Sequence, residues 1–222
     1  MPCLLYCVVL TSAESISGIT GVSDQPVLVR DTGGLRIYWS EVANPETLVA
    51  GPASKAAEQK YLAVQRDIIT RTTAISFPFP AVVADLDSID AVIAEHREYY
   101  LEALTRLADT VQYDLTATWS ADDQADLATP ISGRDYLKRR QESESRIAAI
   151  DAKLKSIAAG IVREWRTRQD RRKHLWFALI ARDDRERFIA ALRSAGPSEG
   201  VRLRLSGPWP PSEFVRRNSE SR

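Results

Sequence analysis

Histidines are the side chains best suited to acid–base catalysis near neutral pH, and the 222-residue sequence has two. His96 lies about one helical turn from Ile93 and from Tyr100, beside an apolar stripe that predicts a buried helix face. His174 precedes an apolar run and follows a basic cluster. No nucleophile accompanies either histidine in a pattern typical of a catalytic pair, so we interpret both as structural.

Carboxylates are the other acid–base candidates. Six lie on expected helix starts and faces, where such charges usually cap helices or face solvent: Glu58, Asp67, Asp85, Asp87, Asp90 and Glu95. A tighter acidic group, Asp122, Asp123 and Asp126, lacks the spacing and the glycine of an EF-hand loop. Glycine motifs for dinucleotides, phosphates or a nucleophile elbow are absent from the sequence. The sequence therefore predicts no enzyme, no cofactor and no metal site.

The two cysteines, Cys3 and Cys7, lie within the apolar run Cys3–Leu10. On a strand, residues four apart are about 13 Å from each other. A disulfide needs Cα atoms within about 7 Å. We therefore expect two buried, reduced thiols, as is usual in a cytoplasmic protein.

The composition predicts a soluble globular protein, with 44% hydrophobic and 27% charged residues. Thirty basic residues balance thirty acidic ones, so no net charge attracts nucleic acid or an anionic membrane, and self-association is permitted. The longest apolar run, Cys3–Leu10, is much shorter than the roughly 20 residues of a membrane-spanning helix.

The first half of the chain predicts strands followed by helices. Strands are expected at Cys3–Leu10, Pro26–Arg30, Leu35–Ser40 and Ala74–Phe79, with a hairpin turn at Gly33-Gly34. A helix from Ser54 to Arg71 would bury Tyr61, Leu62, Val64, Ile68 and Ile69. A longer helix would follow Asp85 and Asp87 and end near Ala108. Its predicted apolar face is Ile89, Val92, Ile93, Tyr100, Leu104 and Leu107.

The second half predicts a β-α-β-α-β order. The expected elements are the strand Val111–Trp119, the helix Gly133–Arg168, the strand Leu175–Ala181, the helix Asp184–Ala195 and the strand Val201–Ser206. The longest helix carries a stripe at Ile147, Ile150, Leu154, Ile157, Ile161 and Trp165. Its distal end, near Trp165, is a candidate partner-binding surface. The order suits a ferredoxin-like sandwich whose remaining strand is absent or confined to Arg171–His174.

The predicted fold class is α+β, with two small domains. Residues 1–109 would form an N-terminal modified α/β sheet domain with a long connecting helix. Residues 110–206 would form the ferredoxin-like domain, and residues 207–222 a proline-rich C-terminal tail.

A basic stretch from Arg163 to Lys173 makes an RNA-binding ferredoxin-like module the alternative function. Such sheets bind RNA through aromatic side chains on central strands. Trp176 and Phe177 are adjacent, so they face opposite sides of a strand, and no RNP-type motif surrounds them. Cations near a helix C-terminus are favourable for stability alone, so nucleic acid is not the expected partner.

The most distinctive segment is Gly207–Val215, with the sequence GPWPPSEFV, directly after an alternating strand. Three prolines around one tryptophan make a stiff, low-entropy segment. It either pins Trp209 and Phe214 onto the protein or presents them to a partner. The segment resembles the C-terminal signature of the GvpL/GvpF family of gas vesicle accessory proteins, usually written G-P-W-P-P-Y-x-F. The signature and candidate partner-binding residues are Gly207, Pro208, Trp209, Pro210, Pro211 and Phe214, together with Trp165.

Other segments resemble this family in the same order along nearly the whole chain: Leu5–Val9, Gly33–Leu35, Ile75–Phe79 and Ser132–Lys138. Pro80–Val82 and Ser212 depart from the family pattern, as in a divergent member. The resemblance implies a non-enzymatic accessory role in gas vesicle assembly, in the cytoplasm and at the gas vesicle. The implied partners are the small hydrophobic shell protein and other accessory proteins, with no cofactor and no membrane.

Overall fold

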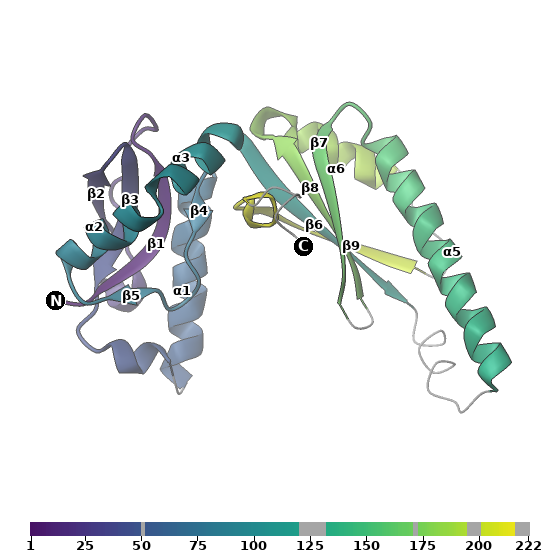
Figure 1. Ribbon diagram of the computed structural model, residues 1–222, viewed down its shortest axis with the longest axis horizontal. Helices are drawn as coiled ribbons and strands as arrows, with labels where there is room; N and C mark the ends of the chain where they lie inside the picture. Colours follow the sequence, from purple (N-terminus) through teal and green to yellow (C-terminus); the bar gives the residue numbers. More distant parts are fainter. Residues whose placement is uncertain (50–51, 120–131, 171–172, 195–200, 216–222) are drawn as a thin grey trace. The chain divides into compact units, whose positions relative to one another are not determined.

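The computed structural model describes residues 1–49, 52–119, 132–170, 173–194 and 201–215 (Figure 1). The chain divides into two compact units. Unit 1 comprises Met1–Val111 together with the chain from Pro208 onward, and unit 2 comprises Gln112–Gly207. The chain therefore passes between the units twice, and the predicted tail groups with the N-terminal residues.

Unit 1 is built on a sheet with the strand order β2-β3-β1-β4, in which β5 also pairs with β1. Its strands are β1 (Cys3–Leu10), β2 (Leu28–Thr32), β3 (Leu35–Glu41), β4 (Ile75–Ser76) and β5 (Val82–Val83). β1 is apolar throughout and almost entirely buried, as predicted. β2 and β3 form a hairpin in which Gly33 (φ 57°) and Gly34 (φ 89°) adopt the left-handed conformation of a tight two-residue turn.

The helices of unit 1 differ from the prediction at two places. They are α1 (Pro52–Ile69), α2 (Leu86–Glu95) and α3 (Arg97–Arg106), with short 3-10 turns at Val22–Asp24, Pro45–Leu48 and Ser212–Phe214. The single helix expected up to Ala108 is two helices, because His96 (φ −117°, ψ 16°) leaves the helical conformation between them. Leu62 of α1 was assigned to the buried stripe and is instead exposed.

A hydrogen-bond network joins α1 to an irregular point of the sheet. The β1–β3 register shifts between Leu5 and Cys7, and only Ile75–Ser76 of the predicted strand Ala74–Phe79 pairs with β1. The Tyr61 hydroxyl of α1 donates to the Leu5 carbonyl (2.7 Å), and Gln65 Nε2 donates to the Tyr6 carbonyl (2.7 Å). The Leu5 carbonyl at the bulge thus accepts from a side chain, and the Tyr6 carbonyl accepts from Gln65 as well as from the Phe77 amide (3.1 Å).

Unit 2 is a four-stranded sheet with the order β7-β8-β6-β9. Its elements are β6 (Thr110–Trp119, which begins in unit 1), α5 (Gly133–Ile157), β7 (Val162–Asp170), β8 (Lys173–Ala181), a 3-10 turn at Arg182–Asp184, α6 (Arg185–Ser194) and β9 (Val201–Trp209). β7 and β8 form an antiparallel hairpin. Tyr113, Phe188 and Trp176 are buried in the core of this unit.

The prediction of one helix from Gly133 to Arg168 is wrong. The helix ends at Ile157, and Gly160 (φ 73°) adopts the left-handed conformation that commonly terminates helices. Val162–Asp170 is the strand that the sequence seemed to lack between the two helices. The spacing of Ile161 and Trp165 suited a helix, but Ile161 lies in the connection and Trp165 on a strand.

The acidic group at Asp122, Asp123 and Asp126, and Ala195 at the end of the predicted helix Asp184–Ala195, lie outside the described part of the structure. The last strand runs to Trp209, so Gly207, Pro208 and Trp209, expected to resist regular structure, are its final residues.

Candidate functional site

Gly207 lies where the signature segment begins, and its backbone requires glycine. Its φ of 133° is one that L-residues with a side chain rarely adopt. A Cβ atom there would lie 2.9 Å from the Gln112 carbonyl oxygen and 2.9 Å from Cδ1 of Tyr113. The first residue of the signature therefore permits close approach of β9 to β6.

The prolines that follow lead into a compact turn. The Ser212 amide donates to the Pro210 carbonyl (2.7 Å), and the Phe214 amide donates to the Pro211 carbonyl (2.9 Å). Pro211 and Val215 are buried, and the Phe214 side chain is 0% exposed. Because proline fixes φ and has little freedom to lose, the segment reaches this conformation at a low entropic cost.

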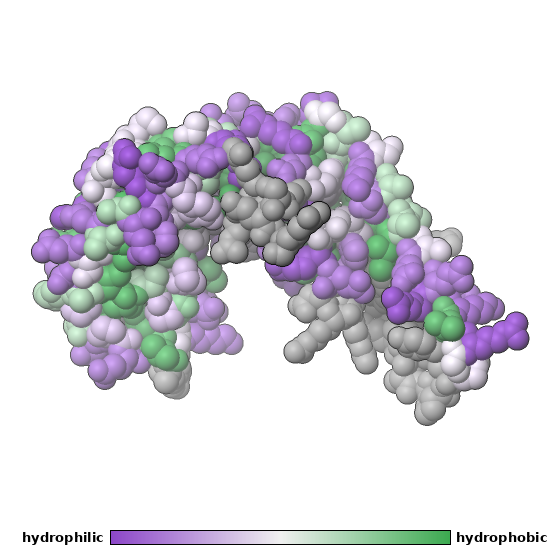
Figure 2. All heavy atoms as spheres, viewed as in Figure 1, coloured by the Kyte–Doolittle hydropathy of each residue, from purple (hydrophilic) through white to green (hydrophobic). Residues whose placement is uncertain are grey.

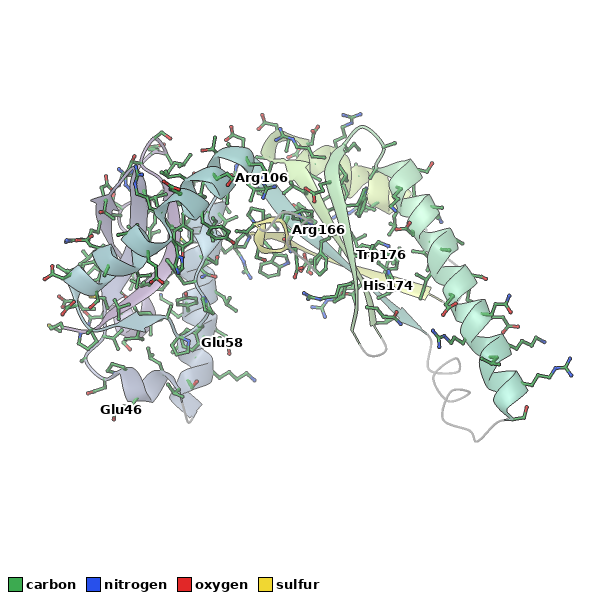
Figure 3. The ribbon with its side chains drawn as sticks, in the orientation of Figure 1. Glu46, Glu58, Arg106, Arg166, His174 and Trp176 are labelled. Atoms are coloured by element: carbon green, nitrogen blue, oxygen red, sulfur yellow. The ribbon has the colours of Figure 1, made fainter. Side chains whose placement is uncertain are left out.

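Two arginines of unit 1 contact the signature segment. One of them, Arg106, is labelled in Figure 3. Arg106 Nη2, in the last turn of α3, donates to the carbonyl oxygens of Phe214 (2.6 Å) and Val215 (3.0 Å). The guanidinium of Arg66 on α1 lies 5.7 Å from the centre of the Trp209 ring, within cation–π range. Phe214 is therefore pinned inside unit 1, whereas the half-buried Trp209 keeps part of its ring at the surface.

Trp165 and residues 208–215 of the signature segment lie in different units. It lies on β7 of unit 2, half-buried, with its ring centre 6.5 Å from that of Phe188. Tyr113 approaches the same phenylalanine at 5.4 Å. Trp165 thus packs at the edge of the unit 2 core instead of projecting at the end of a helix.

Each histidine lies beside an aromatic ring. His96 is exposed at the α2–α3 junction, and its ring lies 6.1 Å from that of Tyr100. His174 is half-buried against Trp176 (4.3 Å between ring centres), whose Nε1 donates to Asp151 (3.1 Å). Burial lowers the pKa of His174, and the charge of Asp151 opposes that shift. Such a histidine is neutral at pH 7 and contributes to packing.

The remaining reactive groups are buried or scattered. Cys3 and Cys7 are free and buried, and burial raises the pKa of both thiols, so neither is an activated nucleophile. Among the described residues, no three His, Cys, Asp or Glu side chains gather as a metal site would need. Across the same residues, no helix combines the length and apolar character needed to cross a membrane.

A pocket of about 290 Å³ lies in unit 1, between the end of β1 and the α3–β6 connection. It is lined by side chains of both charge signs, including Glu14, Arg71 and Asp109, and by no histidine or cysteine.

Sequence reasoning missed the residues that hold the signature. In the sequence, Arg66 and Arg106 have the pattern of ordinary polar positions on amphipathic helices. The residues that they contact, Trp209 and Phe214, lie more than a hundred residues away in sequence. A local pattern carries no signal for such a contact. The signature itself was found because its composition is unusual.

Known proteins resemble this chain over nearly its whole length. The sequence model of the family described as "Gas vesicle synthesis protein GvpL/GvpF" matches residues 2–216. Gas vesicle protein L1 of Halobacterium salinarum is 26% identical, over 95% of this chain and 89% of that protein. Gas vesicle protein F of a Streptomyces species is 26% identical, over 91% of this chain and 92% of that protein.

Solved structures share the fold. The crystal structure of the gas vesicle protein GvpF from Microcystis aeruginosa superimposes with a TM-score of 0.76 at 13% identity, covering 97% of this chain and 99% of that one. GvpF from an Anabaena species gives a TM-score of 0.73 at 14% identity, covering 98% and 97%. Both are mixed α/β structures of the same arrangement as this chain.

Proposed function

Because the chain belongs to the GvpL/GvpF family of gas vesicle synthesis proteins, we propose that it is a non-enzymatic accessory protein of gas vesicle assembly. In this proposal it binds the small hydrophobic shell protein and other accessory proteins, in the cytoplasm and at the growing vesicle. The family match over residues 2–216 is the observation that carries the proposal. The resemblance of the signature segment, noted from the sequence, agrees with it.

The proposed role has a physical rationale. A shell subunit that exposes apolar surface aggregates unless a partner covers that surface. An escort needs a stable fold and an exposed binding surface, and it needs no catalytic group. The burial of the two thiols and the packing of His174 against Trp176 agree with such a role.

We further propose that unit 2 acts as a ferredoxin-like domain, joined to the N-terminal domain near residue 110. The element order β6-α5-β7-β8-α6-β9 and the strand order β7-β8-β6-β9 support this assignment. Residues 208–215 would then dock back on the N-terminal domain, where Arg106 binds the Phe214 carbonyl.

The RNA-binding alternative gains no support from the aromatic side chains on which it depended. Trp176 is 0% exposed, and its ring lies beneath α5, where it donates to Asp151. Phe177 is 3% exposed, and the Arg168 guanidinium lies 5.1 Å from the centre of its ring. Neither ring offers a free face on which a base could stack.

Pressure-sensitive light scattering of cells tests the proposed function, because gas-filled vesicles scatter light until pressure collapses them. We expect deletion of the gene to remove the pressure-sensitive signal and re-expression to restore it. Co-purification of the shell protein with the tagged chain, from the re-expressing cells, tests the binding step. A signal that survives deletion, with no shell protein captured, would refute the proposal.

A further inference from the structure

The net charge of zero conceals an uneven distribution of charge between the two units. Unit 1 has 16 acidic and 11 basic residues, and unit 2 has 14 acidic and 19 basic residues, so their net charges are −5 and +5. Figure 2 shows hydrophilic side chains on the visible surface of both units. Opposite net charges attract, so unit 1 of one copy and unit 2 of another meet no overall electrostatic repulsion.

A large part of the acidic excess of unit 1 lies on α2 and α3. Residues 85–106 contain six acidic residues and two arginines. Both arginines are used inside the unit, because Arg97 donates to the Gly33 carbonyl (2.7 Å) and Arg106 donates to the signature segment. These two helices therefore present more negative than positive charge to solvent.

Three exposed glutamates define the acidic face of α2–α3. Glu95 is the last residue of α2, and Glu98 and Glu102 are four residues apart on one side of α3. Glu95 and Glu98 form no ion pair with a described residue. Their carboxylates are thus available to a cationic partner.

Much of the basic excess of unit 2 lies in the stretch from Arg163 to Lys173, which has six basic and two acidic residues. The structure places the first part of this stretch on β7, which ends the strand order of its sheet. Arg163 and Arg168 of β7 are exposed, and Arg163 forms no ion pair with a described residue. The register with β8 shifts between Val162 and Glu164, so Arg163 lies in a bulge.

The chemistry of the β7 edge favours side-chain contacts over strand pairing. A bulge and charged side chains on an edge strand oppose the addition of another strand. Exposed arginines, in contrast, bind carboxylates and phosphates. Nucleic acid is the less suitable anion, because Trp176 and Phe177 of β8 are buried and offer no face for stacking. The chain itself carries suitable carboxylates, on the acidic face of α2–α3.

We propose that copies of this chain associate head to tail, with the β7 edge of one copy bound to the acidic face of α2–α3 of another. Contacts between exposed charges are individually weak and are screened by salt. The Kd is therefore on the order of 10–100 µM at about 50 mM salt and at least about tenfold higher at about 300 mM salt. Because two different surfaces meet, the contact either closes into a ring or continues as a chain.

Sedimentation velocity of the purified chain, over a range of protein and salt concentrations, tests the proposal. Two charge-reversed variants remove the contact from either side: Arg163→Glu with Arg168→Glu, and Glu95→Arg with Glu98→Arg. We expect each variant alone to stay monomeric at concentrations at which the wild type associates. A mixture of the two variants should associate again, because each then carries the charge that the other requires.

The matched control combines Arg193→Glu on α6 with Arg204→Glu on β9, both at exposed positions of unit 2. It changes the net charge by the same amount, and we expect its Kd to stay within about twofold of the wild-type value. Thermal unfolding of each variant verifies folding.

Three results would overturn the inference. The first is wild-type chain that stays monomeric at about 300 µM and low salt, or a mixture of the two folded, charge-reversed variants that stays monomeric. The second is an equal loss of association in the control, which would assign the effect to net charge alone. The third is RNA that binds the wild type and releases its self-association, which would assign the β7 edge to nucleic acid. The experiment uses the purified chain alone, so its result does not depend on the proposed function.

Discussion

Phe214→Ala is the sharpest test of the role assigned to the signature segment. The Phe214 side chain is fully buried in unit 1, although it lies more than a hundred residues from its contacts on α3. Truncating a buried phenylalanine to alanine removes its transfer free energy and leaves a cavity, at a combined cost of about 3–5 kcal/mol. Arg106 donates to backbone carbonyl oxygens, so the substitution removes none of the atoms that form these hydrogen bonds.

Differential scanning calorimetry measures this cost directly. For a unit of this size, each kcal/mol lowers the Tm by roughly 3–4 °C, so we expect unit 1 to melt roughly 10–20 °C lower. Phe214→Leu should fall between wild type and Phe214→Ala. Ser212→Ala, at an exposed side chain two residues away, should stay within about 0.5 kcal/mol of wild type. If the stability of Phe214→Ala is also within about 0.5 kcal/mol of wild type, the burial of Phe214 does not stabilise unit 1 and the reasoning fails.

Four further substitutions or treatments test other parts of the structure. Gly207→Ala should lower the free energy of unfolding by about 2 kcal/mol or more, because the positive φ strains an alanine and the new Cβ makes close contacts. The control Gly133→Ala has open space around its new Cβ and should not lower the Tm. Trp209→Ala should lower the Tm by less than Phe214→Ala, because Trp209 is only half-buried whereas Phe214 is fully buried. Unchanged melting together with unchanged capture of shell protein would contradict a role for Trp209. Asp85→Ala removes the N-cap of α2 and should lower the Tm at pH 7. Hydrogen bonds from the Ser88 hydroxyl and amide lower the pKa of Asp85 in the folded protein, so the cap stabilises fully above the unfolded pKa near 4 and loses its effect as the pH falls through the folded pKa. The difference in Tm between wild type and Asp85→Ala should therefore disappear in acid. Cys7 should resist a thiol reagent in the native protein and react on unfolding in urea, as mass spectrometry would show, because it is buried and its pKa is raised.

The sequence predicted the elements whose pattern admits one interpretation. The continuous apolar run of β1, the glycine turn at Gly33-Gly34 and the alternation of β6 each match a single structure. The resemblance to the GvpL/GvpF family is confirmed by the match over residues 2–216. Local pattern and composition were sufficient for these conclusions.

The errors arose where one spacing fits two structures. Leu154, Ile161 and Trp165 are seven and four residues apart, which suits a helix, and as apolar residues they seemed to continue the same stripe. Gly160 ends that stripe through its backbone conformation, which periodicity does not measure. The positions of Arg66 and Arg106 opposite the signature were beyond prediction, because they depend on a contact between distant parts of the chain.

The division of the chain has a consequence for how unit 1 forms. Its core includes Phe214, so residues 1–111 alone lack a side chain that the folded unit buries completely. The carbonyl groups that Arg106 binds are also absent until residues 214 and 215 have been made. During synthesis, unit 2 precedes these residues, and unit 1 is completed only after the chain has passed through unit 2 and returned. The stiffness of the proline segment favours that last step, because a chain with few accessible conformations loses little entropy when it docks. The burial of Phe214 in unit 1 therefore gives this residue of the signature a packing role that requires no partner.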